Sequence, residues 1–291
     1  MMNRVWMGVV WAFVLILPTG SAEAVEQLLP DLIAWESEER GFIHGWSIDT
    51  NEIPGRILLR LSSTIANIGA GPMEIRGGVE LPGDKQEVFQ RIYNDDNSFS
   101  DVLAGTFHFH APHGHVHFDG FAQYNLREVT AGNGVGPILS DGSKTSFCLI
   151  DFTKYDLGLP GAPTVEAYDV CESTVQGISV GWADVYNYTL PDQWIDITDV
   201  SRDGDFWLEV VADPDNNLIE SDETNNATRI LITLGGPADF DGDGDMDATD
   251  LELLRQNFGD PAFDLDADLD ADEDDVAYMV NVILNTVYGD A

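Results

Sequence analysis

Basic residues, cysteines and long apolar runs are all scarce in this 291-residue chain. It has 13 lysine and arginine residues against 52 aspartate and glutamate residues, a formal net charge of −39. A surface this acidic repels phosphate groups, so the composition disfavours nucleic acid as a partner and favours calcium or a cationic amine. Apolar residues still make up 44% of the chain, enough to fill one large core and one small one.

Residues 1–24 have the pattern of a secretory signal peptide. Arg4 supplies the positive charge, residues 5–17 the apolar segment and residues 22–24 (AEA) a cleavage site. The apolar segment is short for a membrane span, although an uncleaved N-terminal anchor is the alternative. We therefore expect a mature chain with no transmembrane segment, delivered by bacterial-type export to the extracellular space or the cell surface.

Cysteine is limited to Cys148 and Cys171. In an oxidising compartment the default for such a pair is one disulfide, and closing a loop of this size contributes about 3 kcal/mol. A thiolate metal or redox site is the weaker alternative, because the two residues do not form a C-x-x-C motif.

Histidine, by contrast, is concentrated: five of the six histidines lie within residues 108–117. Alternate residues of a strand share one face, so His113, His115 and His117 are expected to point to the same side. Imidazole suits copper, zinc, iron or nickel, and three rings on one strand can just meet at one ion. The sequence therefore predicts a metal site, and the spacing does not choose among these metals.

The rest of the large domain, residues 25–234, is expected to be mainly β and sandwich-like. Near-alternating apolar residues predict strands over 56–67, 121–129, 194–200, 206–212 and 228–234, whereas polar, turn-rich residues predict a loop over 82–105. Many short strands with few helical periods favour a β-sandwich.

The C-terminal segment, residues 239–291, has seventeen acidic residues and one basic residue. Residues 239–250 place oxygen ligands at the spacing of an EF-hand-type calcium loop, with Gly244 at the sharp turn. A second copy at residues 264–275 has Leu269 at that position. The expected Ca²⁺ ligands are Asp239, Asp241, Asp243, Asp247 and Asp250, then Asp264, Asp266, Asp268 and Asp275. Apolar helices predicted over 251–258 and 276–287 argue against a disordered acidic tail.

This tandem arrangement resembles a dockerin over about fifty residues. The resemblance implies a small α-helical EF-hand pair, joined to the large domain by a linker at residues 235–238, that binds a cohesin-type partner. A calcium-dependent stability or surface-display module is the alternative.

Four segments of the large domain occur in the order and spacing of a known family. They are residues 110–117 (HAPHGHVH), 142–149 (GSKTSFCL), 176–179 (QGIS) and 193–200 (QWIDITDV). Together they make residues 31–233 resemble a lysyl oxidase domain. The resemblance implies that His113, His115 and His117 hold copper, and that Lys144 and Tyr186 join into a lysine tyrosylquinone cofactor.

Neighbouring residues leave alternatives open. Tyr188 is the rival of Tyr186, because the two share a face if the segment is extended. Asp141, just before Gly142, is a candidate catalytic base. His108 and His110 are expected to support the metal site, either as a fourth ligand or by orienting the ligands.

We therefore expect a secreted copper amine oxidase that converts lysyl side chains or small primary amines to aldehydes with O₂, releasing hydrogen peroxide and ammonia. The alternative is a non-catalytic, metal-binding adhesion or display protein with a dockerin attachment module, which has no use for the pair Lys144 and Tyr186. A zinc hydrolase is disfavoured because no positioned general base motif accompanies the histidines.

Overall fold

The structure is a computed structural model that describes residues 25–36, 46–110, 115–142, 144–200, 204–236, 238–242, 244, 246–265 and 270–288. The predicted signal peptide, three expected calcium ligands and one expected copper ligand lie outside the described residues: they are residues 1–24, Asp243, Asp266, Asp268 and His113. The side chain of His110 is also outside them.

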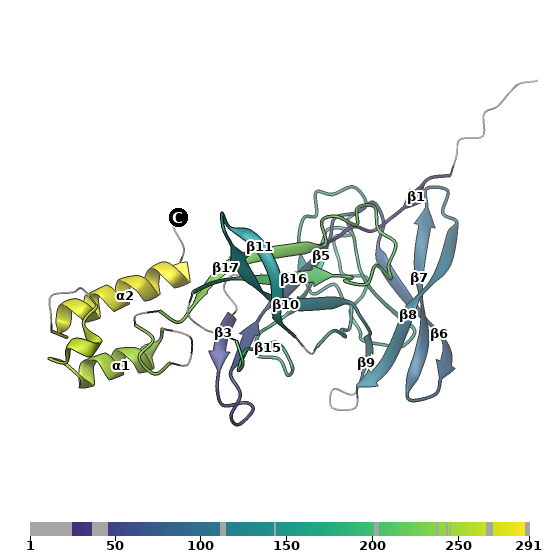
Figure 1. Cartoon of the computed structure of the whole chain (residues 1–291). Helices are drawn as coiled ribbons and strands as arrows, with labels where there is room; N and C mark the ends of the chain where they lie inside the picture. The colour runs from purple at the N-terminus through teal and green to yellow at the C-terminus, as the bar shows by residue number, and fades with distance from the viewer. Residues whose placement is uncertain are drawn as a thin grey trace, which may run out of the picture.

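The predicted mainly β architecture is confirmed, and the histidines belong to its largest sheet (Figure 1). This sheet has the order β13 (Val175–Ile178), β6 (Met73–Leu81), β7 (Lys85–Asn94), β8 (Phe99–His110), β9 (His115–Phe118), with β1 (Gln27–Leu28) pairing on β7. Each pairing is antiparallel.

The loop predicted over residues 82–105 is wrong, because β7 and most of β8 form a long hairpin there. Val88 and Ile92 fill the core, as alternation in a strand requires. Gln90 between them is 1% exposed, and its side-chain amide pairs with both backbone groups of Ile219, at 2.7 and 2.8 Å. β7 thus contains one buried polar residue satisfied by hydrogen bonds, while its other polar residues are exposed or half-buried, which together gave it the composition of a loop.

Three smaller sheets complete the large domain. Their orders are β11 (Gly134–Asp141), β10 (Ala122–Thr130), β16 (Gly204–Ala212), β17 (Ala227–Leu234); then β12 (Thr153–Lys154), β14 (Trp182–Tyr186), β5 (Ser63–Asn67), β2 (Leu32–Ala34); then β15 (Trp194–Asp196), β4 (Leu58–Leu61), β3 (Trp46–Asp49). The strand predicted over 56–67 is therefore two strands in different sheets, separated at Ser62. The strand predicted over 194–200 ends early, at Asp196.

The C-terminal segment contains α1 (Ala248–Gln256), a short 3₁₀ helix (Pro261–Phe263) and α2 (Glu273–Tyr288), and it lies at one end of the β domain (Figure 1). It has its own small core of Ala238, Leu254, Ala271 and Met279, which shares no residue with the main core. Ala238, expected in the linker, therefore packs with the C-terminal helices; we call residues 238–288 the helical module. Among the described residues, no helix combines the length and hydropathy needed to cross a bilayer.

Candidate metal and cofactor site

The short strand β9 carries two of the expected copper ligands. His115 and His117 point to the same side, with their Nε2 atoms 2.9 Å apart and their ring centroids 4.8 Å apart. Two nitrogens bound to one tetrahedral ion at 2.0–2.1 Å lie about 3.3 Å from each other. The two ring nitrogens are within hydrogen-bond distance of each other, and moving them apart by about 0.4 Å would let both bind one ion.

Strand β8 places two further histidine positions opposite them, with His108 facing His117 and His110 facing His115. The ring centroids of His108 and His117 are 5.9 Å apart. His108 Nδ1 lies 2.5 Å from Asp119 Oδ1, and the other oxygen of Asp119 accepts a hydrogen bond from Thr106 Oγ1 at 2.8 Å. A carboxylate on one ring nitrogen fixes the orientation of the imidazole beside a metal site. Asp119 was not singled out from the sequence.

Lys144 is buried, with 7% of its surface exposed, and lies three residues before Phe147, whose backbone pairs with Phe118 of β9. Its Nζ lies 5.9 Å from the ring centroid of Tyr186 and 5.6 Å from that of Phe147. Burial lowers the pKa of Lys144, and the charge of Asp192 opposes this only in part. More of its amine is therefore in the neutral, nucleophilic form than in an exposed lysine.

Tyr186, the last residue of β14, is partly buried and held at both ends. Its hydroxyl donates to the carbonyl oxygen of Cys148, and its ring packs edge-on against Phe147 at 4.5 Å. Burial, and then the charge of Asp184, raise the pKa of its phenol well above the usual value. Tyr188 lies beyond the strand end, where its backbone bonds to Ser62 and Arg60. In the described part of the chain, the tyrosine ring that Lys144 faces is thus that of Tyr186.

Backbone pairing ties the histidine strand to the lysine segment. Phe118, next to His117, exchanges two hydrogen bonds with Phe147, at 2.7 and 3.0 Å. Gln176 joins the same two segments, since its side chain accepts from Leu149 N and donates to Val116 O. Three of the motifs, far apart in the sequence, are therefore joined by direct hydrogen bonds.

The predicted disulfide between Cys148 and Cys171 is confirmed. The backbone carbonyl of Cys148, one of the two bridged residues, accepts the hydrogen bond from the Tyr186 hydroxyl.

Two carboxyl groups near the motifs differ in their burial. Asp141 is exposed at the end of β11, opposite Asn125. Asp184, which sequence reasoning missed, is 3% exposed and lies two residues before Tyr186 on the same strand. The only sequence signal for it was this i, i+2 spacing.

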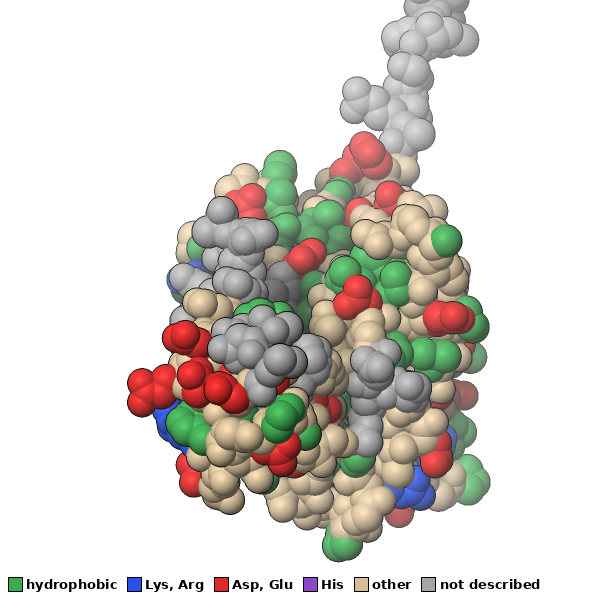
Figure 2. All heavy atoms as spheres, turned by 60° about the vertical axis from the view of Figure 1, so that its left-hand side comes forward, with side chains coloured by type: hydrophobic (Ala, Val, Ile, Leu, Met, Phe, Trp, Pro, Cys, Tyr) green, Lys and Arg blue, Asp and Glu red, His purple; other side chains and the backbone are tan. Residues whose placement is uncertain are grey.

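The two acidic loops of the C-terminal segment share one hydrogen-bond pattern. Asp250 accepts from the N–H groups of Phe240, ten residues earlier, and Asp247, three residues earlier. Asp275 accepts from Leu265 and Asp272 at the same two offsets. In the first loop, one carboxylate oxygen from each of Asp239, Asp241 and Asp250 lies within 4.8 Å of the others. Acidic side chains are widespread on the face that carries this module (Figure 2).

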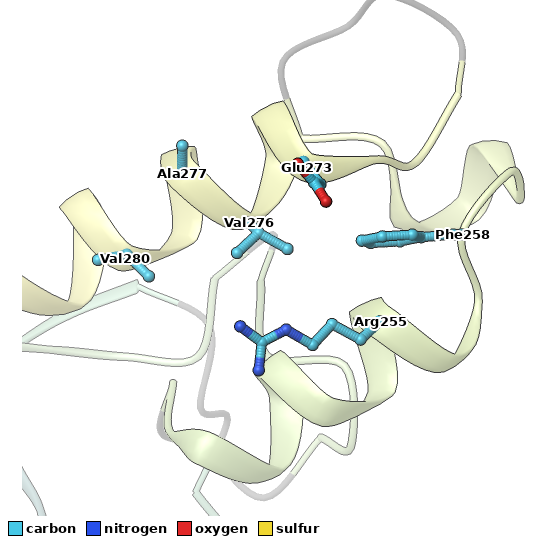
Figure 3. Close-up of a pocket in the computed structure, with 6 residues that line it drawn as sticks. All are labelled: Arg255, Phe258, Glu273, Val276, Ala277 and Val280. Carbon is cyan, nitrogen blue, oxygen red and sulfur yellow. The ribbon is translucent and has the colours of Figure 1, made fainter.

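An apolar groove separates the two helices of the module. It has a volume of about 520 Å³, and Figure 3 shows Val276 of α2 facing Arg255 of α1, with Phe258 at one end.

A second carboxylate cluster, which was not predicted from the sequence, lies in the β domain. Asp213, Glu220 and Glu223 place carboxylate oxygens within 4.8 Å of one another. Burial is the largest cause that raises the pKa of Asp213 to about 6 and that of Glu220 to about 8.

Residues 90–238 match the lysyl oxidase family, and the chain belongs to it. The match includes the histidine strand, Lys144, Tyr186 and both cysteines, and it ends before the acidic loops. Human lysyl oxidase homolog 1 is 39% identical over 132 residues, covering 45% of this chain and 21% of that protein. Zebrafish lysyl oxidase homolog 3B is 34% identical over 175 residues, covering 60% of this chain and 17% of that protein. Pig protein-lysine 6-oxidase is 36% identical over 152 residues, covering 50% and 55%. The chain thus spans about a fifth of the length of the first two relatives.

Proposed function

We propose that this protein is a secreted, copper-dependent amine oxidase of lysyl oxidase type. It would oxidise lysyl side chains of proteins, or small primary amines, to aldehydes with O₂ and release hydrogen peroxide and ammonia. The observation that carries the proposal is the placement of a buried lysine amine 5.9 Å from the ring of Tyr186, beside a strand of converging imidazoles. The relative named protein-lysine 6-oxidase supports the reaction class.

His113, His115 and His117 would hold the metal in this proposal. Copper supplies one-electron chemistry with O₂ at the tyrosine ring, which redox-inert zinc does not. The packing of Phe147 against Tyr186 and the hydrogen bond to Cys148 hold the ring in one orientation during that oxidation.

Lys144 would then bond to the oxidised ring and complete lysine tyrosylquinone, an electron sink for amine oxidation. Burial favours its neutral amine, and its flexible side chain lets Nζ close the few ångströms that remain. The acidic surface would raise the local concentration of cationic amines around the site.

Peptide mapping of copper-loaded, aerated protein tests this proposal. We expect a covalent link between Lys144 and Tyr186 and a positive quinone stain. The link should be absent from Tyr186→Phe and Lys144→Ala, and the quinone stain should be absent from Tyr186→Phe. Both should be present in Tyr188→Phe, the matched control. An unmodified wild-type mass after copper and oxygen exposure, with no peroxide from amines, would leave the non-catalytic metal-binding protein as the better description.

We also propose that the C-terminal segment is a dockerin-like module that binds Ca²⁺ in its two loops. The repeated hydrogen-bond pattern supports tandem loops. Burial, together with the charges of Asp250 and Asp241, raises the pKa of Asp239, a repulsion that a divalent cation would relieve. Calcium should raise the thermal midpoint of the helical signal in wild type and in Glu252→Gln, but much less in an Asp239→Asn, Asp241→Asn double variant. Equal shifts in all three would refute calcium binding in the first loop.

The same resemblance leads us to propose a cohesin-type protein partner. The groove between α1 and α2 offers apolar side chains for such contact. Binding of a purified cohesin, measured by surface plasmon resonance, should weaken at least tenfold in Val276→Asp. No binding by the wild-type module would favour a stability or display role.

A further inference from the structure

Asp184 is a buried carboxyl group with an unmatched oxygen. Its Oδ1 accepts a hydrogen bond from Val185 N at 2.9 Å, while its Oδ2 is buried with no hydrogen-bond partner among the described residues. An unpaired carboxylate oxygen in a protein interior is costly, by more than an ordinary missing hydrogen bond. A residue kept at such a cost calls for a role beyond packing.

The position of Asp184 on β14 directs it to one neighbour. Residues two apart on a strand share a face, so Asp184 and Tyr186 lie on the same side of β14. The two side chains interact: the Asp184 charge raises the pKa of the Tyr186 phenol, and the Tyr186 hydroxyl lowers the pKa of Asp184, although burial keeps the latter well above its usual value.

The other titratable groups that face Asp184 are already engaged. Asp151 accepts hydrogen bonds from Ser179 N and Oγ, both at 2.7 Å. The Tyr124 hydroxyl is bonded to Ser63 Oγ and Gln193 Nε2, again at 2.7 Å each. The Tyr186 hydroxyl is bonded too, to the Cys148 carbonyl, but a carbonyl cannot remove its proton, whereas the carboxylate of Asp184 on the same strand face can.

We propose that Asp184 is the acid–base group of the tyrosine centre, taking the phenolic proton of Tyr186 when that ring is converted to the cofactor. In this step the Oη–H bond of Tyr186 breaks and an O–H bond forms on Asp184 Oδ2, with no transfer of electrons. The step requires Asp184 in its ionised form. Burial raises the pKa of this carboxyl, so its carboxylate is a stronger base than that of an exposed aspartate and keeps the proton while the phenolate reacts. The inference rests on the proposed conversion of Tyr186, and it concerns another step than the substrate deprotonation for which Asp141 is a candidate base.

The first test is the rate of quinone formation after copper and O₂ are added, measured across a pH series. Asp184→Asn keeps the size of the side chain but cannot accept the proton. It should bind copper as wild type does, form quinone about 100-fold more slowly, and lose the rise in rate with pH. Asp184→Glu should regain that rise, and Asp141→Asn should match wild type. A wild-type rate and pH profile in Asp184→Asn would overturn the proposal.

A second test needs neither copper nor quinone, so it separates this inference from the proposed oxidase function. In the metal-free protein, phenol ionisation is followed by ultraviolet absorbance, with Tyr186→Phe used to assign the signal of Tyr186. Removing the Asp184 charge in Asp184→Asn should let Tyr186 ionise at lower pH. An unchanged titration would refute the contact whether or not the wild type forms a quinone. Should Asp184→Asn lose its fold, the same two measurements on Asp184→Ser decide.

Discussion

Replacing both cysteines by serine should destabilise the β domain by about 3 kcal/mol. The disulfide joins residues 23 apart, and the loop-entropy relation gives about 3.4 kcal/mol for a closed loop of that length at 25 °C. A full loss of this size is a large part of the stability of an ordinary domain. The change also acts on the site, because the Cys148 carbonyl holds the Tyr186 hydroxyl.

Urea unfolding followed by tryptophan fluorescence measures this loss without interference from the helical module, since all seven tryptophans precede residue 239. The double variant Cys148→Ser, Cys171→Ser should unfold at lower urea with a free energy about 3 kcal/mol smaller. Wild type in a strong reductant is the matched control and should show the same loss. A difference below about 1 kcal/mol between oxidised wild type and the double variant would refute the reasoning, because the loop would then not be constrained in the unfolded chain.

Three further predictions concern buried carboxylates, and each is read from urea unfolding. Glu209 is fully buried between Arg127 and Arg229, so Glu209→Gln leaves two cations without their counter-charge. We expect the free energy of unfolding to fall by about 2 kcal/mol, a moderate value because both arginines are partly exposed. Burial raises the pKa of Glu220 to about 8, so in chelator-containing buffer the wild-type free energy of unfolding should fall as pH rises from about 5 to about 8. A fall just as steep in Glu220→Gln would contradict this assignment. Asp250→Ala removes the acceptor of three backbone N–H groups. The free energy of unfolding followed by the helical circular dichroism signal should fall by about 3 kcal/mol, while the tryptophan transition stays unchanged.

The sequence was sufficient where spacing alone determines geometry. His115 and His117 share a face because strand residues alternate, and the two acidic loops repeat their hydrogen bonds because their carboxylates recur at a fixed interval. The disulfide followed from a count of two cysteines in a chain whose sequence predicts export.

The sequence failed where tertiary partners decide the outcome. Gln90 looked like a loop residue, but the backbone of Ile219 satisfies its amide, and this pairing lies 129 residues away in the chain. Asp184 and Asp119 were missed for the same reason, since a carboxyl next to a functional group is recognised only once the chain has folded. Asp141, beside a motif in the sequence, is exposed at a strand end, and its role as a base stays a prediction.

The helical module should be dispensable for folding and for quinone formation. The two cores share no buried residue, and Ala238 belongs with the helices, so a chain ending at Gly236 keeps every member of the main core. It loses the hydrogen bonds from Gly235 N to Gly244 O and from Asp239 N to Gly236 O, an effect of about 1 kcal/mol at the end of the chain. The truncated protein should therefore unfold within about 1 kcal/mol of wild type and still form the Lys144–Tyr186 link.

The truncation should weaken the electrostatic attraction of cationic substrates. Residues 239–291 carry seventeen acids against one base, a net charge of −16, and their removal weakens the field that attracts cationic amines. We expect a lower kcat/KM for a cationic substrate at low ionic strength and no difference at high salt, where the Debye length shrinks to a few ångströms. A truncated chain that cannot fold would show instead that the two cores depend on each other, and a salt-independent loss of activity would mean that the module shapes the site itself.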